Sequence, residues 1–229
     1  MAKILSIETA AKVCSVAVHE DGSLLGLSEL HLDNIHGRKL IPVVKELLGS
    51  LGLTGIELDA VAVSKGPGSY TGLRIGVSTA KGLAYAWDLP LIGVDTLDAL
   101  ARNVRGFGIE GNLVIPVLDA RRMEVYAKVL DSEGKELEGV TSVVVDQASF
   151  FGYANEETVY IIGDAVPKLR GVLVHPNMRL IAQFNSAKTV GEIAFESYQL
   201  GVFEDLAYFE PNYLKEFRVI SSKKGLLHT

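Results

Sequence analysis

The sequence predicts an α/β protein with a mixed β-sheet, and two observations indicate it. Near the N-terminus, three short apolar runs are joined by tight turns, one of them the typical hairpin pair Asp21-Gly22. These runs are residues 3–9, 13–19 and 23–30. Further along, an apolar run at 58–64 is followed by a helical pattern that reaches Trp87 and by a second apolar run at 91–94. Strand, helix and strand at this spacing predict a right-handed parallel crossover.

A second lobe is expected after residues 105–111, where glycine becomes frequent. Beyond that stretch, strand-like runs and an amphipathic helix resume, so that a second meander follows the first without visible sequence repetition. We expect these elements at 112–118, 124–130, 140–145, 159–163 and 190–200. The predicted organisation is an N-terminal lobe over 1–104 and a second lobe over 105–202, with the tail from about 203 to 229 packing back on the first lobe.

Composition limits the function classes. Hydrophobic residues make up 48% and charged residues 22% of the chain, which is typical of a soluble globular protein, and no apolar stretch is long enough to span a membrane. The start of the chain enters a strand pattern directly, so we expect no secretory signal and a cytoplasmic location. Cys14 is the only cysteine and is expected to be a buried thiol. The net charge of −6 argues against a basic face, so any contact with tRNA is expected to be indirect.

The stretch from residue 64 to residue 76 is the strongest local signal. Gly66 and Gly68 suit a tight turn, and Ser69 can cap the helix that follows. A strand, a glycine turn and a helix N-terminus together form a candidate anion cradle, to which a carboxylate at the first strand turn could contribute. The possible phosphate-binding residues are Gly66, Gly68, Ser69 and Glu8. An ordinary turn and a solvent-facing Glu8 are the alternative interpretation.

The helix after this turn carries Gly72 and Gly76 four residues apart, beside a core-like stripe. Each glycine costs a helix about 1 kcal/mol relative to alanine, so close approach of another backbone is expected to compensate. That backbone belongs either to this chain or to a second protein. A further helix over 34–52 has an apolar stripe that Ile41 widens, and its His36 has no second ligand at metal-binding spacing, so we predict no metal site.

With these elements in place, the chain resembles the TsaB (YeaZ) family. The match is carried by the run from Gly66 to Gly76, by Ala80-Lys81-Gly82-Leu83-Ala84, and by the shorter pieces Asp119-Ala120-Arg121, Glu124-Val125-Tyr126, Pro211 and Tyr213-Leu214. Tyr70 stands where the family often has phenylalanine, and Glu8 where it often has aspartate. The resemblance implies the two-lobed actin-like (ASKHA/RNase H-like) fold, in which each lobe is a mixed sheet flanked by helices and the second lobe is reduced.

The resemblance also implies a function. TsaB is the non-catalytic partner in tRNA threonylcarbamoyladenosine modification, and its catalytic paralogue TsaD carries two histidines four residues apart. The corresponding positions here are Thr96 and Leu100, so no metal and no cofactor are expected. The implied partners are a TsaD-like paralogue and a TsaE-like ATPase, with a homodimer when the chain is alone. The expected partner-interface residues are Leu40, Val43, Val44, Leu47, Gly72, Leu73, Gly76, Thr79, Ala80 and Leu83.

Two other functions are weighed against this scaffold role. A nucleotide hydrolase would use the 66–69 turn and Glu8, whereas a metallopeptidase would need an H-E-x-x-H or paired ligand histidines, which the sequence lacks. Direct tRNA binding is disfavoured by the acidic balance. For the scaffold, we expect Gly76→Arg or Val44→Glu to abolish pairing while the monomer stays folded.

Overall fold

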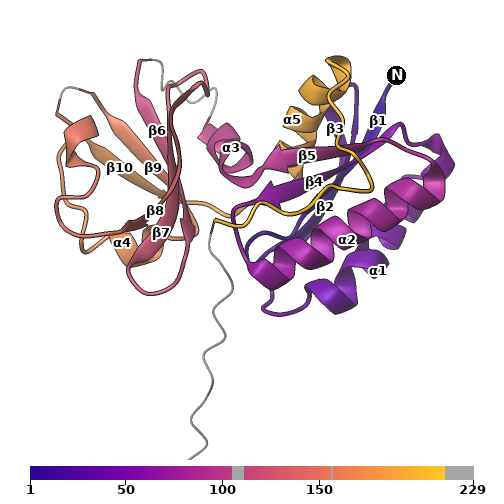
Figure 1. The fold of residues 1–229 in the computed structure, drawn as a ribbon, viewed down its shortest axis with the longest axis horizontal. Helices are drawn as coiled ribbons and strands as arrows, with labels where there is room; N and C mark the ends of the chain where they lie inside the picture. Colours follow the sequence, from indigo (N-terminus) through magenta and orange to yellow (C-terminus); the bar gives the residue numbers. More distant parts are fainter. Residues whose placement is uncertain (105–110, 156, 215–229) are drawn as a thin grey trace, which may run out of the picture.

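The computed structural model describes residues 1–104, 111–155 and 157–214. It has two lobes, each built on a mixed five-stranded sheet and flanked by helices (Figure 1). This is the predicted two-lobed arrangement of mixed sheets flanked by helices, and the helix within the second lobe is short.

The first sheet has the strand order β3-β2-β1-β4-β5. Its strands are β1 (Lys3–Glu8), β2 (Cys14–Glu20), β3 (Ser23–Leu30), β4 (Ala60–Gly66) and β5 (Leu91–Asp95). The first three form the predicted antiparallel meander, while β1, β4 and β5 run parallel. β1 and β4 are buried almost throughout; this agrees with the apolar run that begins β4, whereas β1 also buries the polar Ser6 and Glu8.

The second sheet repeats this topology. Its order, β10-β9-β6-β7-β8, places β6 where the first sheet has β1 and β9 where it has β4. The strands are β6 (Leu113–Asp119), β7 (Glu124–Leu130), β8 (Glu136–Val144), β9 (Val159–Gly163) and β10 (Met178–Ala182). The crossover between β9 and β10 contains only the four-residue helix α4 (Val166–Leu169), and the 3₁₀ turn η3 (Phe151–Tyr153) precedes β9. The second lobe is therefore reduced by shortening its helices and keeping its strands.

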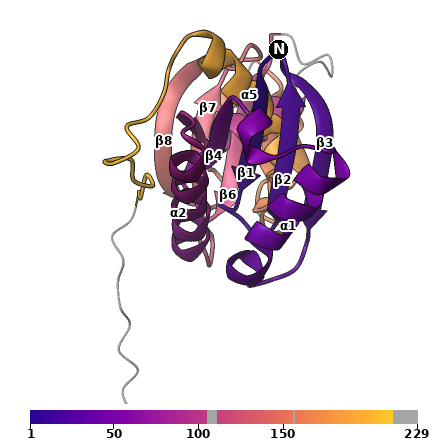
Figure 2. The same ribbon diagram turned by 90° about the vertical axis from the view of Figure 1, so that its right-hand side faces the viewer.

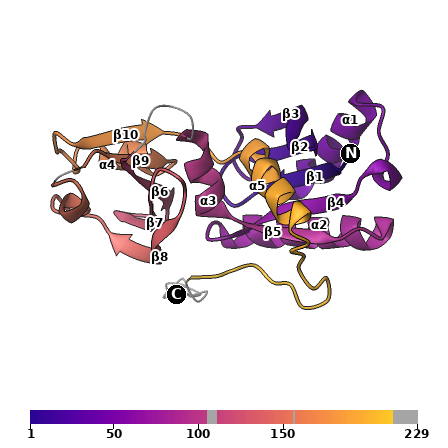
Figure 3. The ribbon, with the colours of Figure 1, turned by 90° about the horizontal axis from the view of Figure 1, so that it is seen from above.

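Helices cover both faces of the first sheet. α1 (His36–Ser50) and α2 (Tyr70–Trp87) lie side by side on one face, and α5 (Ala187–Gln199) crosses the other (Figures 2 and 3). Val190 and Ala194 of α5 pack in one cluster with Ile4 and Ile92. The range assigned to the second lobe, 105–202, thus includes a helix that packs on the first.

Three further segments join these layers. α3 (Thr96–Ala101) continues into the 3₁₀ turn η2 (Arg102–Val104) and lies between the lobes (Figure 3), and η1 (Gly55–Glu57) precedes β4. Residues 204–214 run back along β5 and α2, where the amide of Glu204 donates to the carbonyl of Leu91 at 2.8 Å. The tail from residue 215 lies outside the described residues, and the lobe boundary at 104/105 remains a prediction.

Candidate functional site

The glycine turn between β4 and α2 is shaped by contacts within this chain. A Cβ at Gly66 would lie 2.5 Å from the backbone oxygen of Asn212, and one at Gly68 would lie 2.4 Å from the backbone oxygen of Ala10. Gly66 also has a positive φ of 115°, which disfavours any other residue there. Both glycines are therefore explained by close packing of the first strand turn and the C-terminal segment.

Two amide donors of this turn, those of Gly66 and Ser69, already have partners. The amide of Gly66 donates to Thr96 Oγ1 at 3.1 Å, and that of Ser69 donates to the carbonyl of Ala10 at 2.7 Å. Ser69 caps α2 by accepting from the amide of Gly72 at 3.2 Å. An anion cradle needs amides that point to an open site, so these internal hydrogen bonds weigh against phosphate binding here, which remains a prediction.

Glu8 is fully buried at the end of β1. One carboxylate oxygen accepts from the amide of Ala10 at 2.5 Å, and the other accepts from the hydroxyl of Ser64. Burial raises the pKa of this carboxyl to about 7, although the two hydrogen bonds oppose the shift. The arrangement ties the first strand turn to β4. A carboxyl so enclosed is not presented to a ligand.

The turn between β6 and β7 occupies the equivalent place in the second lobe. The amide of Asp119 donates to Asp164 at 2.9 Å, and the Lys168 ammonium donates to Asp119 at 2.5 Å and to the carbonyl of Glu124 at 2.7 Å. Burial raises the pKa of Asp164. The motif residues Asp119 and Glu124 thus hold the turn in place together with Asp164 and Lys168, two residues that the sequence analysis did not single out.

Most of the predicted interface residues lie in the monomer's own core. Six apolar side chains are buried under the two helices: Leu40, Val43, Val44, Leu47, Leu73 and Ala80. Gly72 and Gly76 face the first strand turn, where an added Cβ would lie 2.1 Å from the backbone oxygen and from Oγ1 of Thr9, respectively. The group that closely approaches each glycine, the backbone of Thr9 at Gly72 and its side chain at Gly76, therefore belongs to this chain. Thr79 and Leu83 are the predicted residues that keep partial exposure.

This placement corrects one expectation. Val44 is only 3% exposed, and Gly76 has no room for a side chain beside Thr9. Gly76→Arg and Val44→Glu would therefore disrupt the monomer itself, because each forces a charged group into a packed interior. We therefore expect both variants to lose the folded monomer, in place of the sequence-based expectation that it stays folded.

The outer surface of the two helices carries a different apolar set. Ile41 is 52% exposed on α1, while Ile75 and Leu83 are partly exposed on α2. The helices meet closely, since a Cβ at Gly37 would lie 3.6 Å from Cδ1 of Ile75. Ile41 follows Gly37 by one helical turn and lies on the same side. In the sequence, Ile41 widens the apolar stripe of the helix predicted at 34–52, and that extra width indicated this surface.

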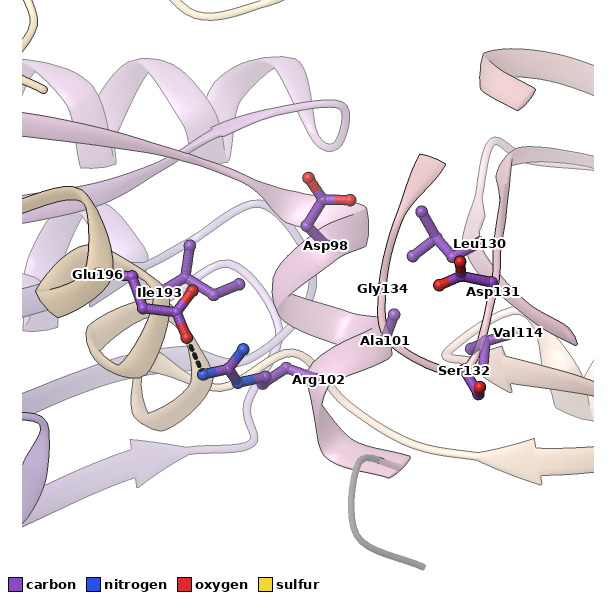
Figure 4. A pocket seen from close by; sticks show the side chains of 10 residues that line it. All are labelled: Asp98, Ala101, Arg102, Val114, Leu130, Asp131, Ser132, Gly134, Ile193 and Glu196. Atoms are coloured by element: carbon purple, nitrogen blue, oxygen red, sulfur yellow. Dashed lines mark hydrogen bonds and ion pairs between the residues drawn. The ribbon is translucent and has the colours of Figure 1, made fainter. Parts of the chain in front are cut away.

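A cavity of about 150 Å³ lies on the opposite side of the molecule, between α3, α5 and the second lobe (Figure 4). Three of its charged lining residues are in ion pairs: Arg102 contacts Glu192 and Glu196, and Asp98 contacts Lys128 at 2.8 Å. The fourth, Asp131, accepts from the amides of Glu133 at 2.9 Å and Lys135 at 2.8 Å. The floor is formed by apolar side chains that include Ala101, Val114, Leu130 and Ile193. The cavity is a gap in the seam between the lobes, and its charged side chains are engaged in contacts within the chain.

Thr96 and Leu100, which the resemblance set against ligand histidines, have structural roles here. Thr96 Oγ1 accepts from the glycine turn, and Leu100 is fully buried between the lobes. Within the described residues, no three His, Cys, Asp or Glu side chains are placed to hold a metal ion. Over the same residues, no helix combines the length and the apolar character that crossing a membrane requires.

Comparison with known proteins identifies relatives along most of the chain. The family model for tRNA N6-adenosine threonylcarbamoyltransferase (TsaD) matches residues 32–219. The tRNA threonylcarbamoyladenosine biosynthesis protein TsaB of Escherichia coli K12 is 40% identical over 125 residues, 54% of this chain and 53% of that protein. The TsaB of Bacillus subtilis 168 is 36% identical over 144 residues, 63% of this chain and 60% of that protein. The chain thus spans between half and three-fifths of the length of these relatives.

Solved structures agree with this result. YeaZ from Pseudomonas aeruginosa superposes with a TM-score of 0.79 at 26% identity, covering 93% of this chain and all of that one. A second Pseudomonas aeruginosa structure, described as similar to the peptidase YEAZ, gives a TM-score of 0.82 at 25% identity over 94% of this chain and all of that one. The predicted resemblance to TsaB is confirmed.

Proposed function

The chain belongs to the tRNA N6-adenosine threonylcarbamoyltransferase family, and from that premise we propose that it is a non-catalytic scaffold subunit in the biosynthesis of tRNA threonylcarbamoyladenosine. One observation carries the non-catalytic part of this proposal. The two positions that would supply ligand histidines hold Thr96 and Leu100, and both are engaged in internal packing. Neither position is available to build a metal centre.

The scaffold acts through partners. We propose pairing with a TsaD-like catalytic paralogue, assembly with a TsaE-like ATPase, a homodimer when the chain is alone, and a cytoplasmic location. The net charge of −6 supports contact with tRNA only through the complex. No cofactor is needed for this role.

The pairing surface proposed is the outer side of α1 and α2. Ile41, Ile75, Thr79 and Leu83 expose apolar or small surface there, whereas the buried residues of the predicted set support the two helices from beneath. Two adjacent helices with an exposed apolar seam suit packing against a helix pair of another subunit. The same face would serve a second copy of this chain when no paralogue is present.

The test substitutes Ile41→Glu, which places a charge on the exposed part of this seam. We expect binding to a TsaD-like paralogue, measured by calorimetry and size-exclusion chromatography, to weaken at least tenfold. The matched control is Ile56→Glu, because Ile56 is 84% exposed on η1, which lies against Trp87 at the C-terminal end of α2. Circular dichroism should show both variants folded. Unchanged binding by Ile41→Glu would remove α1 from the contact.

A second measurement addresses the enzymatic alternative. Purified chain is incubated with ATP and Mg²⁺, alone and with the paralogue. We expect no turnover by the chain alone. Hydrolysis by the chain alone that disappears in a Glu8→Ala variant would contradict the scaffold role and support a nucleotide hydrolase.

A further inference from the structure

The C-terminal strap, residues 204–214, completes one layer of the first lobe. On the face that carries α1 and α2, the apolar cover over β5 comes from this strap: Phe209 is 8% exposed and packs in the same cluster as Leu91, with Leu206 against it. The strap runs past α2 along the edge of the sheet (Figure 3). It takes the place that a third helix would occupy.

Polar contacts hold the strap along its length. At one end the amide of Glu204 donates to Leu91 of β5, and at the other the amide of Asn212 donates to the carbonyl of Lys65 in β4 at 2.6 Å. Between them, the ammonium of Lys81 in α2 donates to the carbonyls of Ala207 at 3.2 Å and Phe209 at 2.9 Å. The strap is therefore fixed to β4, β5 and α2 together.

Two glycines beneath the strap, Gly66 and Gly93, have no side chain and so allow the strap to pack directly on the strands. A Cβ at Gly93 would lie 2.5 Å from the Glu204 carboxylate and 2.9 Å from the ring of Phe209, and one at Gly66 would meet the backbone of Asn212. The strap ends over the first turns of α2, where the rings of Tyr213 and Tyr70 are 4.8 Å apart. The sequence of β4, β5 and α2 is thus fitted to a closed strap.

We propose that the C-terminal strap is a latch that holds α2 and the glycine turn against the first sheet, and that the outer surface of α2 is fully ordered only when the latch is closed. That the strap holds α2 and the glycine turn in place is argued from the contacts above. That the latch controls the outer surface of α2 rests on the proposed function, because the proposed function assigns the pairing surface to α2.

Hydrogen–deuterium exchange of the full chain tests the latch without any partner. Phe209→Ala removes the buried anchor, and Lys81→Met removes the bond to the strap carbonyls while leaving the core intact. We expect amides in residues 66–87 to exchange at least tenfold faster in Phe209→Ala and about threefold faster in Lys81→Met. The control is Tyr208→Ala, since Tyr208 is 84% exposed in the middle of the strap and should leave exchange unchanged.

The helix α5 provides an internal reference, because it lies on the opposite face of the same sheet. Exchange that rises in α2 but not in α5 supports a local latch. Equal acceleration in both helices would indicate general destabilisation and overturn the proposal, as would unchanged exchange of α2 in both variants.

Pairing is then measured with the same variants. At least tenfold weaker binding of the paralogue by Phe209→Ala, with Tyr208→Ala unaffected, supports the coupling. Normal binding despite a loosened α2 would overturn that coupling. Failure of the proposed pairing surface itself is recognised separately, because Ile41→Glu would then also bind normally.

Discussion

At the scale of single residues, two buried ionisable groups place opposite pH dependences on the first lobe. Glu8 has a pKa raised to about 7 by burial, so its stabilising contribution is present below its unfolded pKa of 4.5 and is lost as pH rises through 7. His19, covered by Gly191 of α5, has a pKa lowered to about 4, chiefly by burial and then by the charge of Lys188. Its contribution is present above 6.5 and is lost as pH falls through 4.

These opposing effects predict the behaviour of Glu8→Gln. Each pKa shift corresponds to about 3 kcal/mol of stability at most. Between pH 4.5 and 6.5 the loss of stability from Glu8 and the gain from His19 therefore nearly cancel in the native chain as pH rises. The variant should be more stable than the native chain at pH 8 by up to about 3 kcal/mol, because it buries no charge. Its stability should also rise between pH 4 and 6.5, because the titration of Glu8 then no longer opposes that of His19. Urea denaturation at pH 4.5, 6.5 and 8 measures both effects, and equal stabilities at pH 8 would contradict the buried charge.

Two glycines of α2 offer a matched pair of substitutions. Gly76→Ala places a Cβ against Thr9 Oγ1, whose hydroxyl donates to the carbonyl of Gly72 at 2.8 Å, so we expect a loss of about 1–3 kcal/mol. Gly82→Ala meets nothing within 4 Å and should stabilise the chain by about 0.5–1 kcal/mol, because alanine is the better helix former. Thermal unfolding distinguishes the two. A neutral Gly76→Ala would show that the first strand turn can move away.

At the scale of elements, the strands and long helices follow from sequence periodicity, whereas the role of each helix face does not. The apolar runs of β1 and β4 and the stripe of α2 predicted these elements correctly. The stripe was also assigned to a partner, but a helix on a sheet turns its main apolar stripe toward its own core. The surface that a partner can reach consists of the side chains left exposed after that packing, such as Ile41. It can be identified only when the side of the helix that faces the sheet is known.

Other elements lack a periodic signal. β10 alternates poorly, with Met178 buried, Leu180 and Ile181 partly exposed and the other two residues exposed, and the sequence analysis did not predict it. The strap was expected only as a tail packing somewhere on the first lobe. Its path depends on single contacts with distant residues, such as Lys81 with the carbonyl of Phe209, which no local pattern encodes. The same holds for Asp164 and Lys168, which contact Asp119 in the β6–β7 turn although they lie more than forty residues away in the sequence.

The short helix α3 depends on its cap. Asp95 accepts from the amides of Leu97 at 2.9 Å and Asp98 at 3.2 Å, which satisfies two donors in a helix of six residues. Asp95→Ala should therefore lower the free energy of unfolding by about 1 kcal/mol. Asp95→Asn keeps an acceptor at the same place and should lose less than half of that. Chemical denaturation compares the two variants, and an equal loss would mean that the negative charge, and not the cap, matters.

At the scale of the whole molecule, α3 joins the two lobes through an apolar seam. Leu97, Leu100 and Val104 pack against side chains of the second sheet, among them Val114, Leu118, Leu130 and Ile162. Lys128, only 6% exposed, adds a contact with Asp98 of α3 at 2.8 Å. Lobes move independently by default unless their interface is hydrophobic and well packed. The seam therefore predicts that the two lobes unfold together.

Calorimetry tests this coupling. We expect a single transition whose calorimetric and van't Hoff enthalpies agree. Val166→Ala changes only the core of the second lobe, where Val166 is fully buried, and should shift the whole transition to lower temperature without splitting it. Leu100→Ala instead weakens the seam, should cost about 2–4 kcal/mol, and should broaden the transition toward two components. Two resolved transitions in the native chain would show that the seam does not couple the lobes. A scaffold with independent lobes would then have to bind its partner through the first lobe alone.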